Sequence, residues 1–76
     1  KKDSTMDCTK IIGEKIKALR TEKNLTQAQF GKELGVTQKA VDYWERNVND
    51  PKASYIVRLV RFAGISFDEF FEDIEL

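Results

Sequence analysis

Residues 26–47, TQAQFGKELGVTQKAVDYWERN, decide the fold of this chain. Thr26 and Thr37 each precede a short amphipathic run, and side chains of this type accept hydrogen bonds from the free amides at a helix start. Gly35 lies two residues before the second threonine, where a left-handed residue ends a helix at the least steric cost. The stretch therefore predicts two short helices whose connection is so tight that their axes must cross steeply.

Signals on both sides of this stretch predict three further helices. An apolar stripe at helical spacing runs through residues 10–23 and stops at Asn24, a residue that tolerates the left-handed conformation of a helix end. A turn-rich break at residues 47–51 closes with the only proline and precedes a fourth helix. Ser66 begins a fifth helix as its N-cap, and Glu69 completes a capping box there. We therefore expect an all-α fold of five helices.

The inner sides of the two central helices predict the core. Gly31 falls inside the second helix, where glycine costs about 1 kcal/mol relative to alanine. Close approach of another helix would compensate that cost. In the third helix Ala40, Val41 and Trp44 share one side, and we expect these three side chains to face inward. The remaining side chains of the third helix then face solvent or a ligand.

Composition restricts the functional classes. The chain of 76 residues has room for one domain, which we expect at residues 10–76. Residues 1–9 are polar and are predicted to be disordered, and some of those before Met6 could be additions for expression. With Cys8 as its single cysteine and no histidine, the chain offers neither a disulfide framework nor a zinc site. We expect a cytoplasmic protein that is not an enzyme, has no cofactor and does not span a membrane.

The formal net charge of zero conceals a polarity along the chain. Residues 10–61 contain eleven Lys and Arg against six Asp and Glu, whereas residues 62–76 contain five acids and no base. A basic body suits contact with a polyanion such as nucleic acid. A solvated surface of mixed charge explains the same pattern equally well, so charge alone does not identify a partner.

The central stretch and two later segments together resemble the lambda-repressor-like (Xre-type) helix-turn-helix family. Gln27 opens the second helix as in that family, with glycine at 31 and in the turn at 35. Residues 44–51 are similar to its W-E-x-G-x-x-x-P segment, and residues 64–69, GISFDE, are similar to its entry into the fifth helix. Asn47 stands in place of the family's glycine, a mild departure because asparagine also adopts the left-handed region.

This resemblance implies a five-helix lambda-repressor-like DNA-binding domain in which the second and third helices form the helix-turn-helix. In such domains the third helix enters the major groove. Its outward side chains carry donors and acceptors that read base edges, and the candidates are Gln38, Lys39 and Tyr43, with Asp42 ranked below them. Helix starts and the loop after the third helix supply phosphate contacts, for which the candidates are Gln27, Thr37, Arg46, Asn47, Asn49 and Lys52.

The resemblance also implies two supporting interactions. The side chain of Gln27 is expected to brace Gln38. Arg20 and Glu45 are expected to form a buried or half-buried ion pair that joins the first helix to the end of the third. Replacement of Arg20 by alanine should then destabilise the domain and weaken DNA binding.

The fifth helix provides candidates for a dimer contact. Repressors of this family act as homodimers on inverted repeats, with half-sites roughly 34 Å apart. We expect Phe67 and Phe70 to face the core, and we assign Phe71 and Ile74 to a possible dimer interface. Phe62, where the family has a smaller residue, is either a further dimer contact or part of the core.

The leading interpretation is a regulator of transcription that binds a double-stranded DNA operator in a sequence-specific manner. A repressor is favoured over an activator because occluding a promoter needs no additional surface. The alternative is a protein-interaction module of the same fold, either the antitoxin partner of a toxin or a subunit whose acidic fifth helix docks another protein. Hydrogen-bonding residues on the third helix favour the DNA-binding interpretation, since a pure protein binder would show more apolar side chains there.

Overall fold

The computed structural model describes residues 8–72 of the chain, which form five helices and no strand within that range. The helices are α1 (Cys8–Glu22), α2 (Gln27–Leu34), α3 (Gln38–Glu45), α4 (Ala53–Ala63) and α5 (Phe67–Phe71). The expected all-α class and the five helices are therefore confirmed. Helix α1 begins two residues earlier than predicted, so Cys8 and Thr9 are helical rather than disordered, and the rest of the predicted disordered segment lies outside the described residues.

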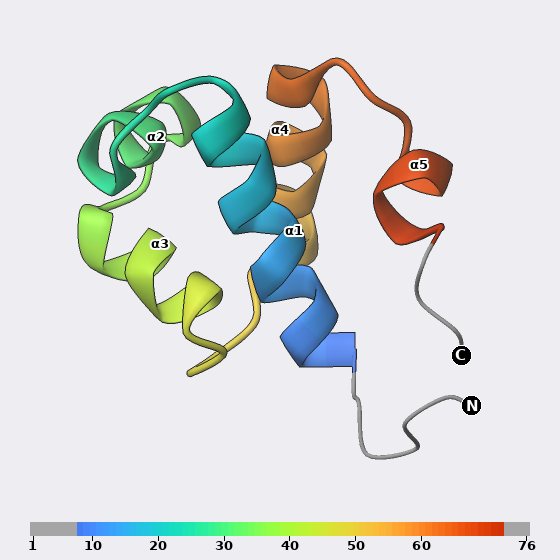
Figure 1. Ribbon diagram of the computed structural model, residues 1–76, viewed down its shortest axis with the longest axis horizontal. Coiled ribbons are helices and arrows are strands. Elements are labelled where there is room, and N and C mark those ends of the chain that lie inside the picture. Colours follow the sequence, from blue (N-terminus) through green and yellow to red (C-terminus); the bar gives the residue numbers. More distant parts are fainter. Residues whose placement is uncertain (1–7, 73–76) are drawn as a thin grey trace.

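Helix α1 passes through the middle of the molecule (Figure 1). Helix α2 packs against both α3 and α4, α1 packs against α3, and α4 packs against α5. Helices α3 and α5 consequently lie at opposite ends of the long axis in this view (Figure 1). Among residues 8–72, no helix has both the length and the apolar character that a membrane crossing needs.

Three helices begin with the side-chain caps that the sequence indicated. The hydroxyl of Thr26 accepts from the backbone amide of Gln29 at 3.1 Å, and the Gln29 side-chain oxygen accepts from the Thr26 amide at 2.8 Å. Ser66 and Glu69 form the same reciprocal capping box at the start of α5, with both bonds at 3.1 Å. Thr37 caps α3 by accepting from an amide one turn further on. Each such cap contributes about 1 kcal/mol to helix stability.

The stops follow the sequence signals as well. Gly35 has φ +79° after α2, and its geometry sets the sharp turn into α3. Asn24 and Asn47 both adopt positive φ, +59° and +63°, as expected for residues whose short polar side chains tolerate the left-handed region. Local sequence thus fixes where the helices of the central stretch begin and end.

The core lies where α1, α2, α3 and α4 meet, with one residue contributed by α5. Its buried side chains are Ile12, Ile16, Phe30, Leu34, Val41, Trp44, Leu59, Val60 and Phe70. Trp44 is only 5% exposed, which confirms its predicted inward position. The expectation that Phe67 faces the core is wrong, because this side chain is 47% exposed. Phe67 occupies the first position of a five-residue helix, and the buried position in that helix is taken by Phe70.

Two glycines mark the closest approaches between elements. A Cβ atom on Gly31 would lie 2.7 Å from the carbonyl oxygen of Val36, so a close contact compensates the cost of glycine inside α2. The contact is with the backbone of the turn between α2 and α3 rather than with another helix, as had been expected. A Cβ atom on Gly13 would lie 2.6 Å from the carbonyl oxygen of Trp44. The approach at Gly13 brings α1 against the end of α3 and was not anticipated from the sequence.

Candidate nucleic-acid interface

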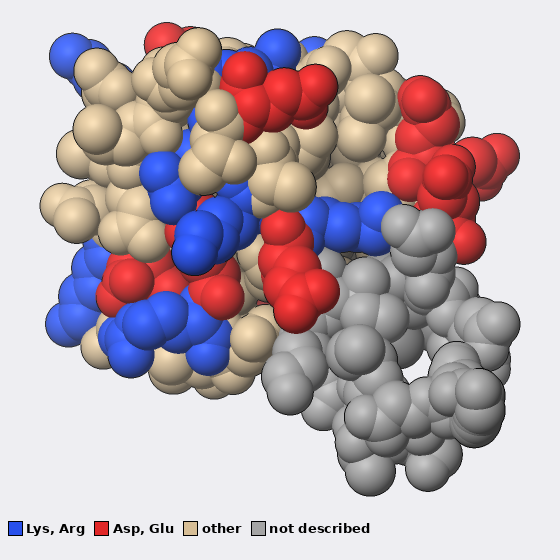
Figure 2. Space-filling model, viewed as in Figure 1, with Lys and Arg blue, Asp and Glu red and all other residues tan. Residues whose placement is uncertain are grey.

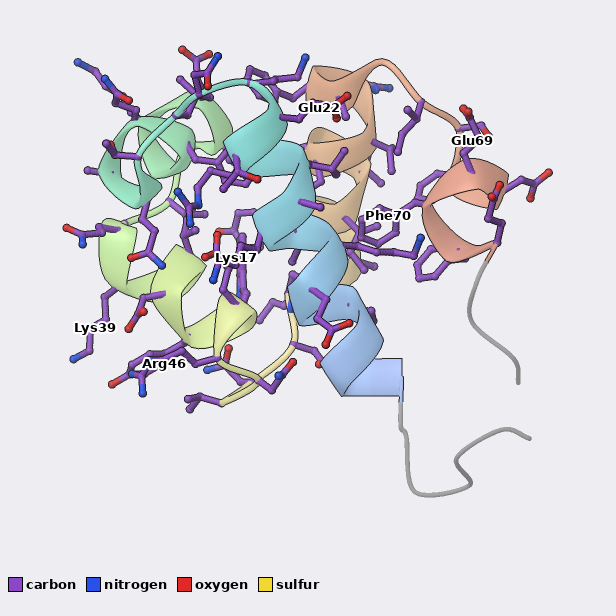
Figure 3. All side chains as sticks on the ribbon, in the orientation of Figure 1. Lys17, Glu22, Lys39, Arg46, Glu69 and Phe70 are labelled. Carbon is purple, nitrogen blue, oxygen red and sulfur yellow. The ribbon has the colours of Figure 1, made fainter. Side chains whose placement is uncertain are left out.

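Helix α3 has one buried side and one solvent-facing side. Val41 and Trp44 are buried beneath it, whereas Gln38, Lys39 and Arg46 are exposed. Lys39 and Arg46 point away from the other helices (Figure 3). Charged atoms of both signs gather at this end of the surface (Figure 2). The candidate base-reading residues therefore share one accessible helix face.

Tyr43 organises the charges on this face. Two cations lie near its ring, with the Nζ of Lys39 5.5 Å from the ring centroid and the Cζ of Arg46 at 5.7 Å. Exposed cation–π contacts of this kind contribute about 0.5–1 kcal/mol each. Arg46 also donates a hydrogen bond to Asp42 at 3.0 Å. Asp42 is the one acid among the four candidate base readers, and this bond places a cation beside it. A phosphate approaching α3 would therefore meet an acid whose charge is already partly compensated.

The ion pair that the resemblance implied fastens the end of α3 to α1. Arg20 donates twice to the carboxylate of Glu45, through Nε at 2.6 Å and through Nη2 at 3.0 Å. Its Nη1 donates at 2.9 Å to the carbonyl of Leu25, ahead of α2. The two charged side chains are 13% and 4% exposed. The hydrogen bonds to Glu45 raise the pKa of Arg20, against the opposing effect of burial, so the guanidinium stays charged.

Gln27 connects α2 to α3, although not through the residue that was expected. Its side-chain amide donates to Glu45 at 3.1 Å and more weakly to Asp42 at 3.4 Å. Gln27 was expected to brace Gln38, but its side-chain amide group donates to Glu45 and Asp42 instead. The amide group of Gln27 is drawn to the two carboxylates of α3, since a charged acceptor makes a stronger hydrogen bond than a neutral amide.

Apart from Gln27, which is half-buried, the candidate phosphate contacts separate into two groups. Thr37, Arg46, Asn49 and Lys52 are exposed. The side-chain oxygen of Asn47 is buried and has no hydrogen-bond partner among the described residues. It faces Gly13 of α1 so closely that a Cβ on residue 13 would clash with it. This inward position argues against a phosphate contact through the Asn47 side chain.

A groove of about 680 Å³ is lined by base-reading candidates and by phosphate-contact candidates. Thr37, Lys39 and Tyr43 line it from the start and outer face of α3. Asn49 and Lys52 line it from the loop that leads into α4. Some candidates of each kind therefore border one depression, whereas Gln38, Asp42 and Arg46 lie outside its lining.

Helix α4 contributes a residue that the sequence did not single out. Arg58 donates through Nη1 to the carbonyl of Leu34 at 2.9 Å, at the turn between α2 and α3. Its guanidinium also lies 5.1 Å from the ring of Tyr55, and that ring lies 5.9 Å from the ring of Trp44. Arg58 thus ties α4 to the helix-turn-helix. A basic residue on the polar side of an amphipathic helix gives no sequence signal of such a role.

The three candidate dimer residues occupy different environments. Phe62 is half-buried against the core, with its ring 5.8 Å from that of Phe30. Phe71 is also half-buried and packs edge-on against Phe70 at 4.9 Å. Ile74 lies outside the described residues. Of the two that are described, Phe62 is the one committed to the core by an inter-helix ring contact.

Two short helices joined by a glycine turn, with an exposed polar face on the second, define a helix-turn-helix domain. A family model described as "Helix-turn-helix" matches residues 16–70, and the chain belongs to this family. The match includes the whole of α2, α3 and α4.

Relatives of this chain include named regulators of transcription. The HTH-type transcriptional activator BcrR of Enterococcus faecalis is 35% identical over 65 residues, which cover 86% of this chain and 32% of that protein. Repressor protein C2 of Salmonella phage P22 is 35% identical over 60 residues, which cover 79% of this chain and 28% of that protein. The chain thus spans about a third of the length of these two relatives. An uncharacterized HTH-type transcriptional regulator of Methanocaldococcus jannaschii is 30% identical over 75% of this chain and 86% of its own length.

Solved structures show the same architecture. The P22 c2 repressor in complex with a synthetic operator matches with a TM-score of 0.71 and 32% identity, over 78% of this chain and 89% of that chain. A variant of the restriction-modification controller protein C.Esp1396I matches with a TM-score of 0.74 over 86% of this chain and 84% of that chain. The identity to the controller protein is 23%, so that likeness concerns the fold.

Proposed function

We propose that this domain binds double-stranded DNA in a sequence-specific manner and that the protein regulates transcription, as a repressor. The observation that carries the proposal is the outer face of α3, where hydrogen-bonding side chains are exposed on a helix whose inner face is buried. The bidentate bond between Arg20 and Glu45 holds that helix in a fixed orientation. A rigid helix with a polar outer face suits base reading, because discrimination between bases depends on precise placement.

The outward side chains of α3, of which Gln38 and Lys39 are exposed and Asp42 and Tyr43 half-buried, suit particular base edges. The amide of Gln38 can donate to and accept from adenine, and the ammonium of Lys39 can donate to the guanine acceptors. The ring of Tyr43 offers an apolar contact for a thymine methyl, and its flanking cations add attraction to the groove. Asp42 ranks below these three because its carboxylate already accepts from Arg46 and Gln27.

The backbone of the duplex would be held on both sides of the base-reading face. Thr37 lies at the positive end of α3, and Gln27 begins α2, so both helix starts favour a nearby phosphate. Arg46, Asn49 and Lys52 would contact phosphate from the end of α3 and from the following loop. These contacts position the domain without specifying sequence.

Two features of the relatives support a regulatory role. Their names include both an activator and a repressor, and the P22 c2 repressor structure contains a synthetic operator. We favour repression because a bound domain occludes a promoter with the described surface alone. We further propose a homodimer on an inverted repeat, with Phe71 and Ile74 in the contact, and a cytoplasmic location beside the DNA. The antitoxin alternative is not favoured, since the outer face of α3 is polar.

Selection from a random duplex library at moderate salt tests this proposal. The wild-type chain should enrich a common motif arranged as an inverted repeat. The variant Gln38→Ala/Tyr43→Ala should enrich a different motif or none, whereas Lys32→Ala, which changes an exposed residue of α2 outside the groove, should enrich the wild-type motif. The absence of any enriched motif for the wild-type chain would contradict sequence-specific reading.

A further inference from the structure

A second groove, of about 260 Å³, lies between α1 and the segment that leads into and out of α5. Its floor is apolar and consists of Leu19, Ile65 and Phe70. Leu19 and Ile65 are half-buried and pack against the core, so the apolar floor is part of the stable interior. The base-reading proposal makes no use of this groove.

Three acids line the same groove, and we call the whole depression the acidic groove. Glu22 lies at the end of α1, and Glu69 and Glu72 belong to α5 and its C-cap. Glu22 and Glu69 lie on the two sides of the gap (Figure 3). Figure 2 shows acidic atoms at the top and at the α5 end of this face, with uncharged surface between them and basic atoms below it. Lys15 is the single base of the lining and already interacts with another residue.

The acidic groove is remote from the proposed DNA surface. It is bordered by α5, which lies at the opposite end of the long axis from α3 (Figure 1). An occupant of the groove would therefore leave Gln38, Lys39 and Tyr43 accessible. The acids would also repel DNA, so the groove does not suit a second duplex contact.

We propose that the acidic groove docks a short basic segment of another protein that carries one large apolar side chain. The apolar side chain would insert over Leu19, Ile65 and Phe70, and its flanking Lys or Arg residues would pair with the glutamates of the rim. Protein interfaces commonly have an apolar centre surrounded by a polar or charged rim. The buried apolar side chain of the partner would supply most of the affinity, and the charged residues around it would supply specificity.

A second copy of this chain fits the acidic groove less well. In a symmetric dimer the same patch meets itself, so the three glutamates of each copy would face those of the other with one lysine on each side. Like charges placed together in this way oppose association. The charge of the groove therefore favours a basic partner, and the inference does not depend on DNA binding.

The experiment uses the whole chain, labelled with 15N, and a set of short synthetic peptides. In each peptide Lys and Arg flank a single Leu, Ile, Phe or Trp, and the control peptides have Glu in place of every base. At least one basic peptide should shift the amide signals of Leu19, Ile65 and Glu69 in a saturable manner, and its Glu-containing counterpart should not. If no basic peptide shifts these signals, or if both peptide types shift them equally, the proposal is wrong.

Charge-reversal variants locate the contact. Glu22→Lys/Glu72→Lys should weaken peptide binding about tenfold or more, since two ion pairs become repulsive. Glu33→Lys makes the same type of change on the exposed side of α2 and should leave binding within about twofold of wild type. If the double reversal lowers the thermal midpoint, Glu22→Gln/Glu72→Gln replaces it, and binding unchanged in that variant contradicts the proposal. Concentration-dependent dimerisation through the same residues, measured by sedimentation, would also overturn it in favour of a second copy.

Discussion

Replacement of Arg20 by alanine should be among the most damaging single changes in this domain. The substitution removes both bonds to Glu45 and the bond to the Leu25 carbonyl. It leaves a carboxylate that is 4% exposed, with the neutral amide of Gln27 as its remaining hydrogen-bond donor among the side chains described above. Removal of one member of a buried pair costs roughly 3 kcal/mol or more. A domain of 76 residues has a free energy of unfolding of about 4–11 kcal/mol in total.

Thermal unfolding followed by circular dichroism measures this effect. A loss of roughly 3 kcal/mol should lower the Tm by about 12–24 °C in a domain of this size. Arg20→Lys retains the charge but not the planar fork, so its Tm should fall between those of the wild type and the alanine variant. Adding Glu45→Ala to Arg20→Ala should cost less than the sum of the two single changes, because the unpaired carboxylate is then gone. A Tm for Arg20→Ala within about 2 °C of the wild type would refute the reasoning.

Three further predictions concern other residues. Gly13→Ala should destabilise the domain by roughly 1–3 kcal/mol, despite the higher helix propensity of alanine, because its Cβ would clash with the Trp44 carbonyl; a raised Tm would contradict this. Asn47→Val should cost about 1–2 kcal/mol, since Asn47 has positive φ, whereas Asn47→Gly should be nearly neutral in urea denaturation. Gln38→Ala should leave the Tm unchanged within about 2 °C, because Gln38 is exposed, yet alter base preference in competition binding.

The helix boundaries of the central stretch could be predicted because their causes are local. A cap needs only the cap residue and the residue three positions later, as at Thr26 with Gln29 and at Ser66 with Glu69. A left-handed stop needs only one residue, as at Gly35. Gly31 was also interpretable, because an unfavourable residue inside a helix indicates a compensating close contact.

The rest depended on contacts between residues far apart in the sequence. The close approach at Gly13 involves the end of α3, more than thirty residues away. The bond from Arg58 to the Leu34 carbonyl joins residues separated by 24 positions. Helical periodicity assigned Phe67 to the core because it lies on the same apolar stripe as Phe70. Helix α5 has only five residues, however, and Phe70 is the one side chain in it that is buried. Such outcomes depend on how helices are placed, which no local pattern encodes.

The candidate site was predicted in outline rather than in detail. The outer face of α3 follows from its helical period once Val41 and Trp44 are placed in the core. The inward position of Asn47 does not follow, because a loop residue with a polar side chain is typically expected to face solvent. Gln27 likewise has a choice of polar partners, and only the three-dimensional arrangement of Glu45 and Asp42 decides between them.

The most direct test of the central claim is a comparison of DNA affinities for one selected duplex and a scrambled duplex of equal length and composition. Fluorescence anisotropy at several salt concentrations should show the selected duplex bound at least about a thousandfold more tightly by the wild-type chain. Both affinities should fall as salt rises, and Gln38→Ala should reduce the ratio between them without a matching loss for the scrambled duplex. Equal affinities for the two duplexes would contradict the claim that α3 reads sequence.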